Sequence, residues 1–151
     1  MQIIANNKKA FFQYFIQEKI EAGIQLTGDE VKSVRSGKAS IKEAYAETKK
    51  GQIYLINSDI SAYEKSSRYI KLDAKRSRKL LLHKKEISRL QGKIEREGMT
   101  IIPLKMYLNK RGLIKIEIAV AKGKKLYDKR EDKKKKDWNK QKKRLLKNLS
   151  I

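Results

Sequence analysis

Cysteine is absent from this 151-residue chain, and histidine occurs once, at His83. The absence of cysteine excludes disulfide bonds, zinc ribbons and thiol nucleophiles, and it fits a reducing compartment such as the cytosol. Long hydrophobic runs are also missing: no window approaches the roughly eighteen apolar residues of a membrane span, and the N-terminus lacks a signal-peptide pattern. We therefore expect a cytoplasmic protein that is neither exported nor inserted into a membrane.

Acidic residues are few: the chain has 17 Asp and Glu and 39 Lys and Arg, which gives a formal net charge of +22. Residues 122–151 hold fourteen basic and four acidic side chains, a net charge of +10, which leaves +12 for residues 1–121. A charge of about two to eight suffices to keep a small domain soluble. The excess predicts a polyanionic partner, and the phosphates of a nucleic acid are the natural one.

The composition divides the chain into a folded domain, residues 1–121, and a basic C-terminal tail, residues 122–151. The tail has too few apolar side chains to offset the entropy of ordering itself, so we expect it to be disordered alone. Trp138, Leu145 and Leu149 fall near one helical stripe, which predicts a narrow amphipathic helix. Such a helix could lie on RNA, on a membrane surface or against the folded domain. The stripe is too narrow for a strong membrane anchor.

Alternating apolar residues predict two strands at the end of the folded domain. The first has Ile102, Leu104, Met106 and Leu108 on one face, and the second has Ile114, Ile116, Ile118 and Val120 on one face. The polar residues 109–112 between them suit a hairpin loop. A second hairpin is expected where residues 45–48 meet residues 52–56, and residues 14–26 are a further strand candidate.

Two helices have clear start and stop signals. Thr27 and Glu30 have the spacing of a capping box, and Gly37 suits a left-handed C-terminal residue, so a helix is predicted at about 28–36. A second helix is predicted at about 84–97, ended by Gly98.

Two further segments have weaker patterns. Residues 7–13 predict a short helix capped by Asn6 or Asn7. Residues 58–77 lack a period, so we expect a long surface loop that touches a ligand.

Five or six short strands with small helices in one basic domain predict a mainly β fold. The expected architecture is an OB-fold-like antiparallel barrel with flanking helices and the basic C-terminal tail. A β-sandwich is the alternative.

Candidate catalytic groups are scarce. His83 follows three leucines and precedes a predicted helix, so we expect it to begin that helix or to contact RNA rather than act as a general base. Asp128, Glu131 and Asp132 have helical spacing that could hold Mg²⁺, but the basic residues among them favour local ion pairs. The sequence predicts no catalytic residue, no metal site and no cofactor.

Several separate stretches, in a fixed order, carry a resemblance to a known family. They are Asn7-Lys8-Lys9-Ala10, Tyr14-Phe15-Ile16, Glu21-Ala22-Gly23-Ile24, Glu30-Val31-Lys32-Ser33-Val34-Arg35-Ser36-Gly37-Lys38, Arg78-Lys79-Leu80-Leu81-Leu82-His83, and Ala121-Lys122-Gly123-Lys124-Lys125 with Asp128-Lys129-Arg130. Together they resemble the small protein B (SmpB) family, the tmRNA-binding proteins of bacterial trans-translation. The resemblance covers nearly the whole chain from Asn7.

The resemblance implies a non-enzymatic RNA-binding protein with an OB-like barrel. The body would bind the tRNA-like domain of tmRNA and help deliver it to ribosomes stalled on messages without a stop codon. The tail would fold as a helix in the decoding centre and the empty mRNA channel of the ribosome. We expect the protein to act as a monomer.

The matching motifs also imply site residues. Asn7, Glu21 and Leu81 take the positions needed for tmRNA binding, and Lys32, Arg35, Lys38 and His83 are added as further contacts. Leu81 could instead belong to the core, and Glu21 could orient neighbouring basic side chains. In the tail, the matching residues are Gly123, Lys124, Lys125, Asp128, Lys129, Arg130 and Trp138. Residues 133–136 depart from the family pattern, since four lysines replace a string that often contains apolar and acidic members.

Other functions remain open on the sequence alone. A ribosomal protein or another rRNA-binding factor would share the basic tail and small barrel. A phosphodiester-cleaving enzyme on an OB-like scaffold and a membrane-surface protein are the remaining alternatives.

Overall fold

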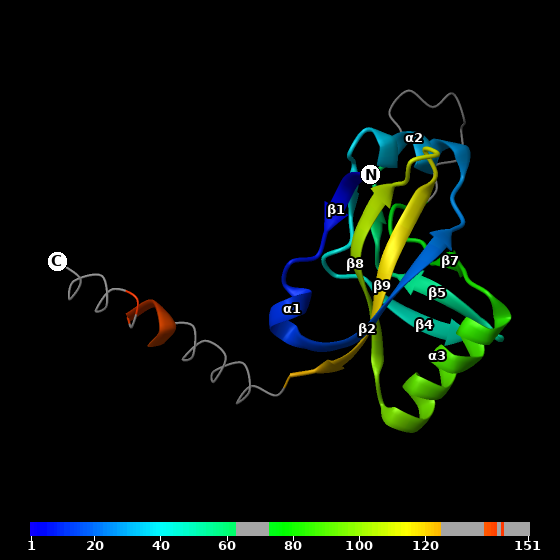
Figure 1. Ribbon diagram of the computed structural model, residues 1–151. Helices are drawn as coiled ribbons and strands as arrows, with labels where there is room; N and C mark the ends of the chain where they lie inside the picture. Colours follow the sequence, from blue (N-terminus) through cyan, green and yellow to red (C-terminus); the bar gives the residue numbers. More distant parts are fainter. Residues whose placement is uncertain (63–72, 125–137, 142, 144–151) are drawn as a thin grey trace.

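The computed structural model describes residues 1–62, 73–124, 138–141 and 143 (Figure 1). Within residues 1–62 and 73–124 it contains nine strands and three helices. The strands are β1 (Gln2–Asn6), β2 (Tyr14–Ile24), β3 (Ala39–Ser40), β4 (Tyr45–Lys49), β5 (Gln52–Ile56), β6 (Asp59–Ile60), β7 (Arg78–Leu81), β8 (Thr100–Leu108) and β9 (Ile114–Gly123). The helices are α1 (Ala10–Gln13), α2 (Gly28–Arg35) and α3 (Lys84–Glu97). Since β9 reaches Gly123, it extends beyond the predicted domain boundary at residue 121.

The main sheet closes on itself. Its strand order is β1-β8-β4-β5-β7-β2-β9, and an additional antiparallel pairing joins β9 back to β8, so that β8, β4, β5, β7, β2 and β9 form the closed ring. One edge of β8 is shared, because β4 pairs at Ile101 and β1 pairs farther along, at residues 105–108. Closure removes the exposed strand edges that an open sheet would present. The predicted antiparallel barrel with flanking helices is confirmed, and the β-sandwich is not.

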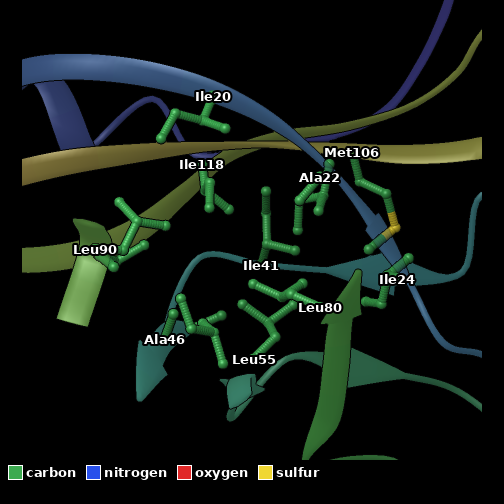
Figure 2. Close-up of a cluster of buried hydrophobic side chains, with 14 of the residues drawn as sticks. Ile20, Ala22, Ile24, Ile41, Ala46, Leu55, Leu80, Leu90, Met106 and Ile118 are labelled. Atoms are coloured by element: carbon green, nitrogen blue, oxygen red, sulfur yellow. The ribbon is translucent and has the colours of Figure 1, made fainter. Parts of the chain in front are cut away.

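The barrel interior is filled by aliphatic side chains from most of its strands. Figure 2 shows Ile20 and Ala22 of β2, Leu55 of β5, Leu80 of β7 and Ile118 of β9 gathered around a common centre. Leu90 of α3 joins this core, and α3 lies at the end of the barrel opposite α2 (Figure 1). The predicted inward face of β9 is confirmed, because its aliphatic residues belong to this one cluster.

The prediction of a single apolar face on β8 was wrong. Met106 lies in the main core, but Ile102 and Leu104 pack outside the barrel with Ala10 of α1 in a second cluster. The pairing of β8 with β9 shifts register between Pro103 and Lys105. A bulge places one extra residue in a strand, so the side chains beyond it alternate in the opposite sense. Alternation read from the sequence cannot reveal such a shift.

Both well-signalled helices are confirmed. In α2, Thr27 Oγ1 accepts a hydrogen bond from the Glu30 backbone N–H at 3.2 Å, and Glu30 Oε1 accepts one from the Thr27 N–H at 2.9 Å. Gly37, with φ of 78°, follows α2, and Gly98, with φ of 63°, ends α3. These φ values favour glycine because they crowd a Cβ atom.

The short N-terminal helix is smaller than predicted, and its cap was wrongly assigned. The helix α1 begins at Ala10, Lys9 is its N-cap residue, and no side chain caps it. Asn6 ends β1, and the Asn7 side chain bonds to another strand. Sequence patterns also missed β1, β3, β6 and β7, which are short or lack alternation.

The predicted loop at residues 58–77 contains β6, which pairs with β3. Its ends are tied to the fold, since the Ile60 N–H donates to the Ala74 carbonyl at 3.0 Å. The central residues 63–72 lie outside the described part of the chain.

Candidate nucleic-acid interface

The outer surface of β2, β9 and β8 carries a cluster of polar side chains. Glu21 is paired with Glu117, and Glu117 is paired with Lys105 on the next strand. One step along, Gly23 is paired with Lys115, and Lys115 with Tyr107. Because the alternate residues Ala22, Ile116 and Met106 fill the core, these six positions lie on the outer face of the sheet, where Tyr107 is nevertheless only 5% exposed.

Tyr107 holds Glu21 in place across this surface. The Tyr107 hydroxyl donates a hydrogen bond to Glu21 Oε2. Lys105 Nζ lies 5.5 Å from the centroid of the Tyr107 ring and 3.9 Å from Glu117 Oε2. Burial of the phenol, together with its bond to Glu21 and the charge of Glu117, raises the pKa of Tyr107 above its ordinary value. The hydroxyl therefore stays protonated and keeps its proton available for Glu21.

Leu81 lies beside this cluster and is not a core residue. It is 51% exposed, whereas Leu80 before it is fully buried in the barrel. Leu81 is paired with Gly23, which is two residues from Glu21 on the same face of β2. The structure thus brings the predicted residues Glu21 and Leu81 together on one surface, and it contradicts a core role for Leu81.

The predicted basic residues Lys32, Arg35 and Lys38 are exposed at or near α2. Arg35 Nη2 donates a hydrogen bond to the Gly112 carbonyl at 3.2 Å, and Gly112 belongs to the turn between β8 and β9. This contact places the C-terminal end of α2 next to the same two strands that carry Tyr107 and Lys115. The basic last turn of α2, which carries Lys32 and Arg35, therefore borders the polar surface.

A buried ion cluster fixes α2 to the barrel. Arg78 is fully buried, and its guanidinium donates to Glu30 Oε2 at 2.7 Å and to the Ser58 hydroxyl at 2.9 Å. Arg76 also bonds to Glu30. Burial raises the pKa of Glu30, but hydrogen bonds from the two arginines and from the Thr27 backbone outweigh it and leave that pKa below its ordinary value. The carboxylate therefore stays charged and holds the helix.

Asn7 occupies a buried position in the barrel wall. Its Nδ2 donates to the Pro103 carbonyl at 3.0 Å, and its backbone N–H donates to the Leu104 carbonyl at 2.8 Å. These are the carbonyls at the bulge in β8, so Asn7 satisfies acceptors at the point where the register shifts. The predicted role of Asn7 in tmRNA binding stays a prediction, and the geometry indicates that it would act by supporting β8.

His83 is exposed and is the N-cap residue of α3, as expected. Its backbone N–H donates to Glu86 Oε1 at 3.2 Å. An RNA contact of its side chain stays a prediction.

Three of the predicted tail residues are described. Gly123 ends β9, and the Lys124 N–H donates to the Gln13 carbonyl at 2.9 Å. Lys124 Nζ also lies 4.8 Å from the centroid of the Phe15 ring. Trp138 is 57% exposed, within a helical stretch at residues 138–141. Lys125, Asp128, Lys129 and Arg130 lie outside the described residues, as do Glu131, Asp132 and residues 133–136.

The described part of the chain contains no candidate metal site and no candidate membrane-spanning helix. In these residues, no group of three or more His, Cys, Asp and Glu side chains is arranged to hold a metal ion. Within the same residues, no helix has the length and apolar character needed to cross a membrane.

Sequence reasoning missed Tyr107, Gly23 and Arg78. Tyr107 stands between Met106 and Leu108 on the polar side of a predicted strand, and only the pairing of three strands places it near Glu21. Both Gly23 and Arg78 occur in the stretches that carry the family resemblance, but the spacing along the chain does not show what they contact.

Known proteins match this chain over most of its length. The model of the SmpB protein family matches residues 4–148. An SsrA-binding protein of Afipia carboxidovorans is 54% identical over 146 residues, covering 97% of this chain and 92% of the relative. An SsrA-binding protein of a Bradyrhizobium species is 57% identical over 144 residues, covering 95% of this chain and 91% of the relative.

A solved structure agrees with the sequence comparison. It is described as "tmRNA-SmpB: a journey to the center of the bacterial ribosome", and its matching chain is 48% identical with a TM-score of 0.65. The match covers 80% of this chain and 84% of the other. The family match spans both the barrel and the basic C-terminal segment, so the chain belongs to the SmpB protein family.

Proposed function

We propose that this protein binds the tRNA-like domain of tmRNA and delivers it to stalled ribosomes in trans-translation. The observation that carries the proposal is the outer surface of β2, β9 and β8, where Glu21, Tyr107 and the exposed Leu81 lie together beside the basic last turn of α2. The names of the relatives, SsrA-binding proteins, support the same partner. They favour tmRNA over a permanent place in the ribosome as a ribosomal protein.

The surface offers three kinds of contact to a folded RNA. Lysine and arginine side chains at α2 neutralise phosphates, which supplies affinity that falls with salt. Leu81 supplies an apolar contact for a ribose or a base. Glu21 does not attract phosphate, but its carboxylate accepts hydrogen bonds from a 2′-hydroxyl or a base amino group. The body thus combines charge with groups that recognise nucleosides.

The tail has a separate role in the proposal. It acts on the ribosome, folding as a helix in the decoding centre and the empty mRNA channel, with Gly123, Lys124, Lys125, Asp128, Lys129, Arg130 and Trp138 as its working residues. The bond from Lys124 to Gln13 supports this role, since it gives the tail a fixed starting point on the body. A basic segment that orders only on RNA loses its conformational entropy only when it binds at the correct site.

The proposal includes no catalysis and no cofactor, and it makes the protein a cytoplasmic monomer. The test is binding of the full-length chain to the tRNA-like domain of tmRNA, measured by fluorescence anisotropy at fixed salt. A hairpin RNA of equal length serves as the control. We expect the tRNA-like domain to bind at least tenfold more tightly. Equal affinity for both RNAs would contradict the proposal and favour a general polyanion-binding protein.

A further inference from the structure

We propose that Gly23 is a positioning residue for RNA recognition: its missing side chain lets Leu81 lie flat on β2, next to the Glu21 carboxylate. The exposed Leu81 side chain then packs against the face of a ribose or base, and Glu21 accepts a hydrogen bond from the same nucleoside. This inference rests on the proposed function, and it assigns a role to a residue that itself makes no polar contact.

The first observation is how closely Leu81 approaches Gly23. The two residues are paired across β2 and β7. A Cβ atom added at Gly23 would lie 3.1 Å from Leu81 Cβ, 3.4 Å from its Cδ1 and 3.7 Å from its Cγ. The shortest of these is tighter than an ordinary van der Waals contact, so a side chain at position 23 would displace Leu81 by a few tenths of an ångström.

The backbone gives no other reason for glycine at this position. The described glycines with positive φ are Gly37, Gly51, Gly98 and Gly112, and Gly23 is not among them. Alanine would therefore fit the local φ and ψ of β2. Glycine in the interior of a strand weakens it and commonly marks a close approach of another group. At Gly23, the approaching group is the side chain of Leu81.

The second observation is that Leu81 gains little from the barrel itself. It stays half exposed, while Leu80 fills the core. Its neighbours on the outer surface are polar: Glu21 lies two residues from Gly23, and Lys115 lies opposite Gly23 on β9. A leucine held flat among polar groups matches a nucleoside, which presents an apolar face and hydrogen-bond donors at its edge.

The Glu21 carboxylate is oriented to accept a hydrogen bond from that nucleoside. Tyr107 donates to Oε2 of Glu21, and the bond orients the carboxylate. A displaced Leu81 would no longer pack against the nucleoside in the position that lets this nucleoside donate to Glu21. The effect of a side chain at position 23 should therefore pass through Leu81.

A double-mutant cycle on the full-length chain tests this coupling. Gly23→Ala, Leu81→Ala and the double variant are titrated with the tRNA-like domain of tmRNA at several salt concentrations. We expect Gly23→Ala to weaken binding about tenfold in the wild-type background and less than twofold in the Leu81→Ala background. The salt slope should not change, since no phosphate contact is lost. A merely structural role of Gly23 would weaken binding equally in both backgrounds.

Gly92→Ala is the matched control, because the added Cβ in α3 would meet nothing within 4 Å. It should leave RNA binding unchanged. Thermal unfolding of each variant, followed by circular dichroism, shows whether the barrel is retained. If Gly23→Ala does not fold, the NMR chemical shifts of the Leu81 methyl groups in the wild-type chain test the proposal. They should change when the RNA is added, and unshifted methyl resonances would overturn the proposal.

Several outcomes overturn the inference. They are equal effects of Gly23→Ala in both backgrounds, no effect in either, or no loss of binding in Leu81→Ala. Failure of the proposed function is distinct, since the wild-type chain itself would then not prefer the tRNA-like domain over the control hairpin.

Discussion

At the scale of single residues, the role of Glu21 depends on its neighbours. A carboxylate on a surface that binds a polyanion is unfavourable if it only meets phosphates. The bond from Tyr107 fixes this carboxylate as an acceptor, and Glu117 is balanced by Lys105 nearby. In the proposed function, Glu21 would therefore add specificity and the surrounding lysines would add affinity.

The first prediction concerns Tyr107→Phe. The change removes the hydroxyl that holds Glu21, so tmRNA affinity should fall about three- to tenfold, the effect of roughly 1 kcal/mol from one hydrogen bond. The salt slope should stay the same, because the number of phosphate contacts is unaltered. Tyr45→Phe on β4 is the control and should bind as the wild type does. An unchanged affinity of Tyr107→Phe would show that Glu21 needs no support.

The raised pKa of Tyr107 adds a test of the same residue by pH. The unfolded chain deprotonates this phenol near its ordinary pKa of 10.0, whereas the folded protein keeps it protonated. Stability from this group is therefore complete below pH 10 and is lost as the pH rises above it. The Tyr107→Phe variant should lack this part of the loss of stability at alkaline pH. Its ultraviolet titration should show one fewer tyrosine that deprotonates late.

At the scale of elements, the two ends of α2 are fixed by different interactions. The ion pair of Glu30 with the buried Arg78 fixes the first turn of α2. At the last turn of the helix, Arg35 bonds to the loop between β8 and β9. This helix carries Lys32, so its position decides where positive charge borders the polar surface. A change in the buried cluster should therefore affect both stability and RNA binding.

The second prediction concerns Glu30→Gln. The variant leaves Arg78 buried without its ionic partner, which should lower the free energy of unfolding by about 3–5 kcal/mol. The lowered pKa of Glu30 means that its contribution is present above the ordinary value of 4.5 and is lost as the pH falls through the folded pKa. Below that range, the variant and the wild type should converge. Urea unfolding between pH 3 and pH 7 measures this.

The exposed Glu47 on β4 provides the control for that comparison. Glu47→Gln should leave the stability within about 0.5 kcal/mol, as is usual for surface changes. A Glu30→Gln protein as stable as the wild type at pH 7 would show that Arg78 finds other partners.

At the scale of the whole molecule, charge and contacts are divided between the body and the tail. The surface with Glu21 and Leu81 lies in the barrel, and residues 1–121 keep a net charge of +12. The tail begins at the end of β9, and Lys124, the residue after this strand, is bonded to Gln13 and lies over the Phe15 ring. Binding of tmRNA and action on the ribosome should therefore be separable.

The third prediction concerns deletion of residues 131–151. The truncated protein should keep its tmRNA affinity within about tenfold, or roughly 1.4 kcal/mol. It should fail to support peptide tagging on stalled ribosomes, because the segment that we propose to enter the ribosome is gone. Gel shifts with tmRNA and a tagging assay in vitro measure the two activities. A truncated chain that no longer binds tmRNA would contradict this division.

The sequence by itself determined the local elements and the class of partner. Alternation predicted β9, the capping box of Thr27 and Glu30 predicted α2, and the ratio of basic to acidic residues predicted a polyanion. Each of these signals lies within about ten residues of chain or in the composition. Short-range patterns are readable because they depend on local geometry and on charge, not on distant pairing.

The tertiary structure alone decided which residues share a surface. Asn7 meets Pro103 across a bulge, which reverses the faces of β8, and this reversal cannot be read from alternation. Tyr107 meets Glu21, and Leu81 lies on Gly23, only because antiparallel strands pair in one register. These residues are far apart in the chain, so their contacts depend on closure of the barrel. For this reason the sequence predicted several candidate site residues but not the groups that hold them in place.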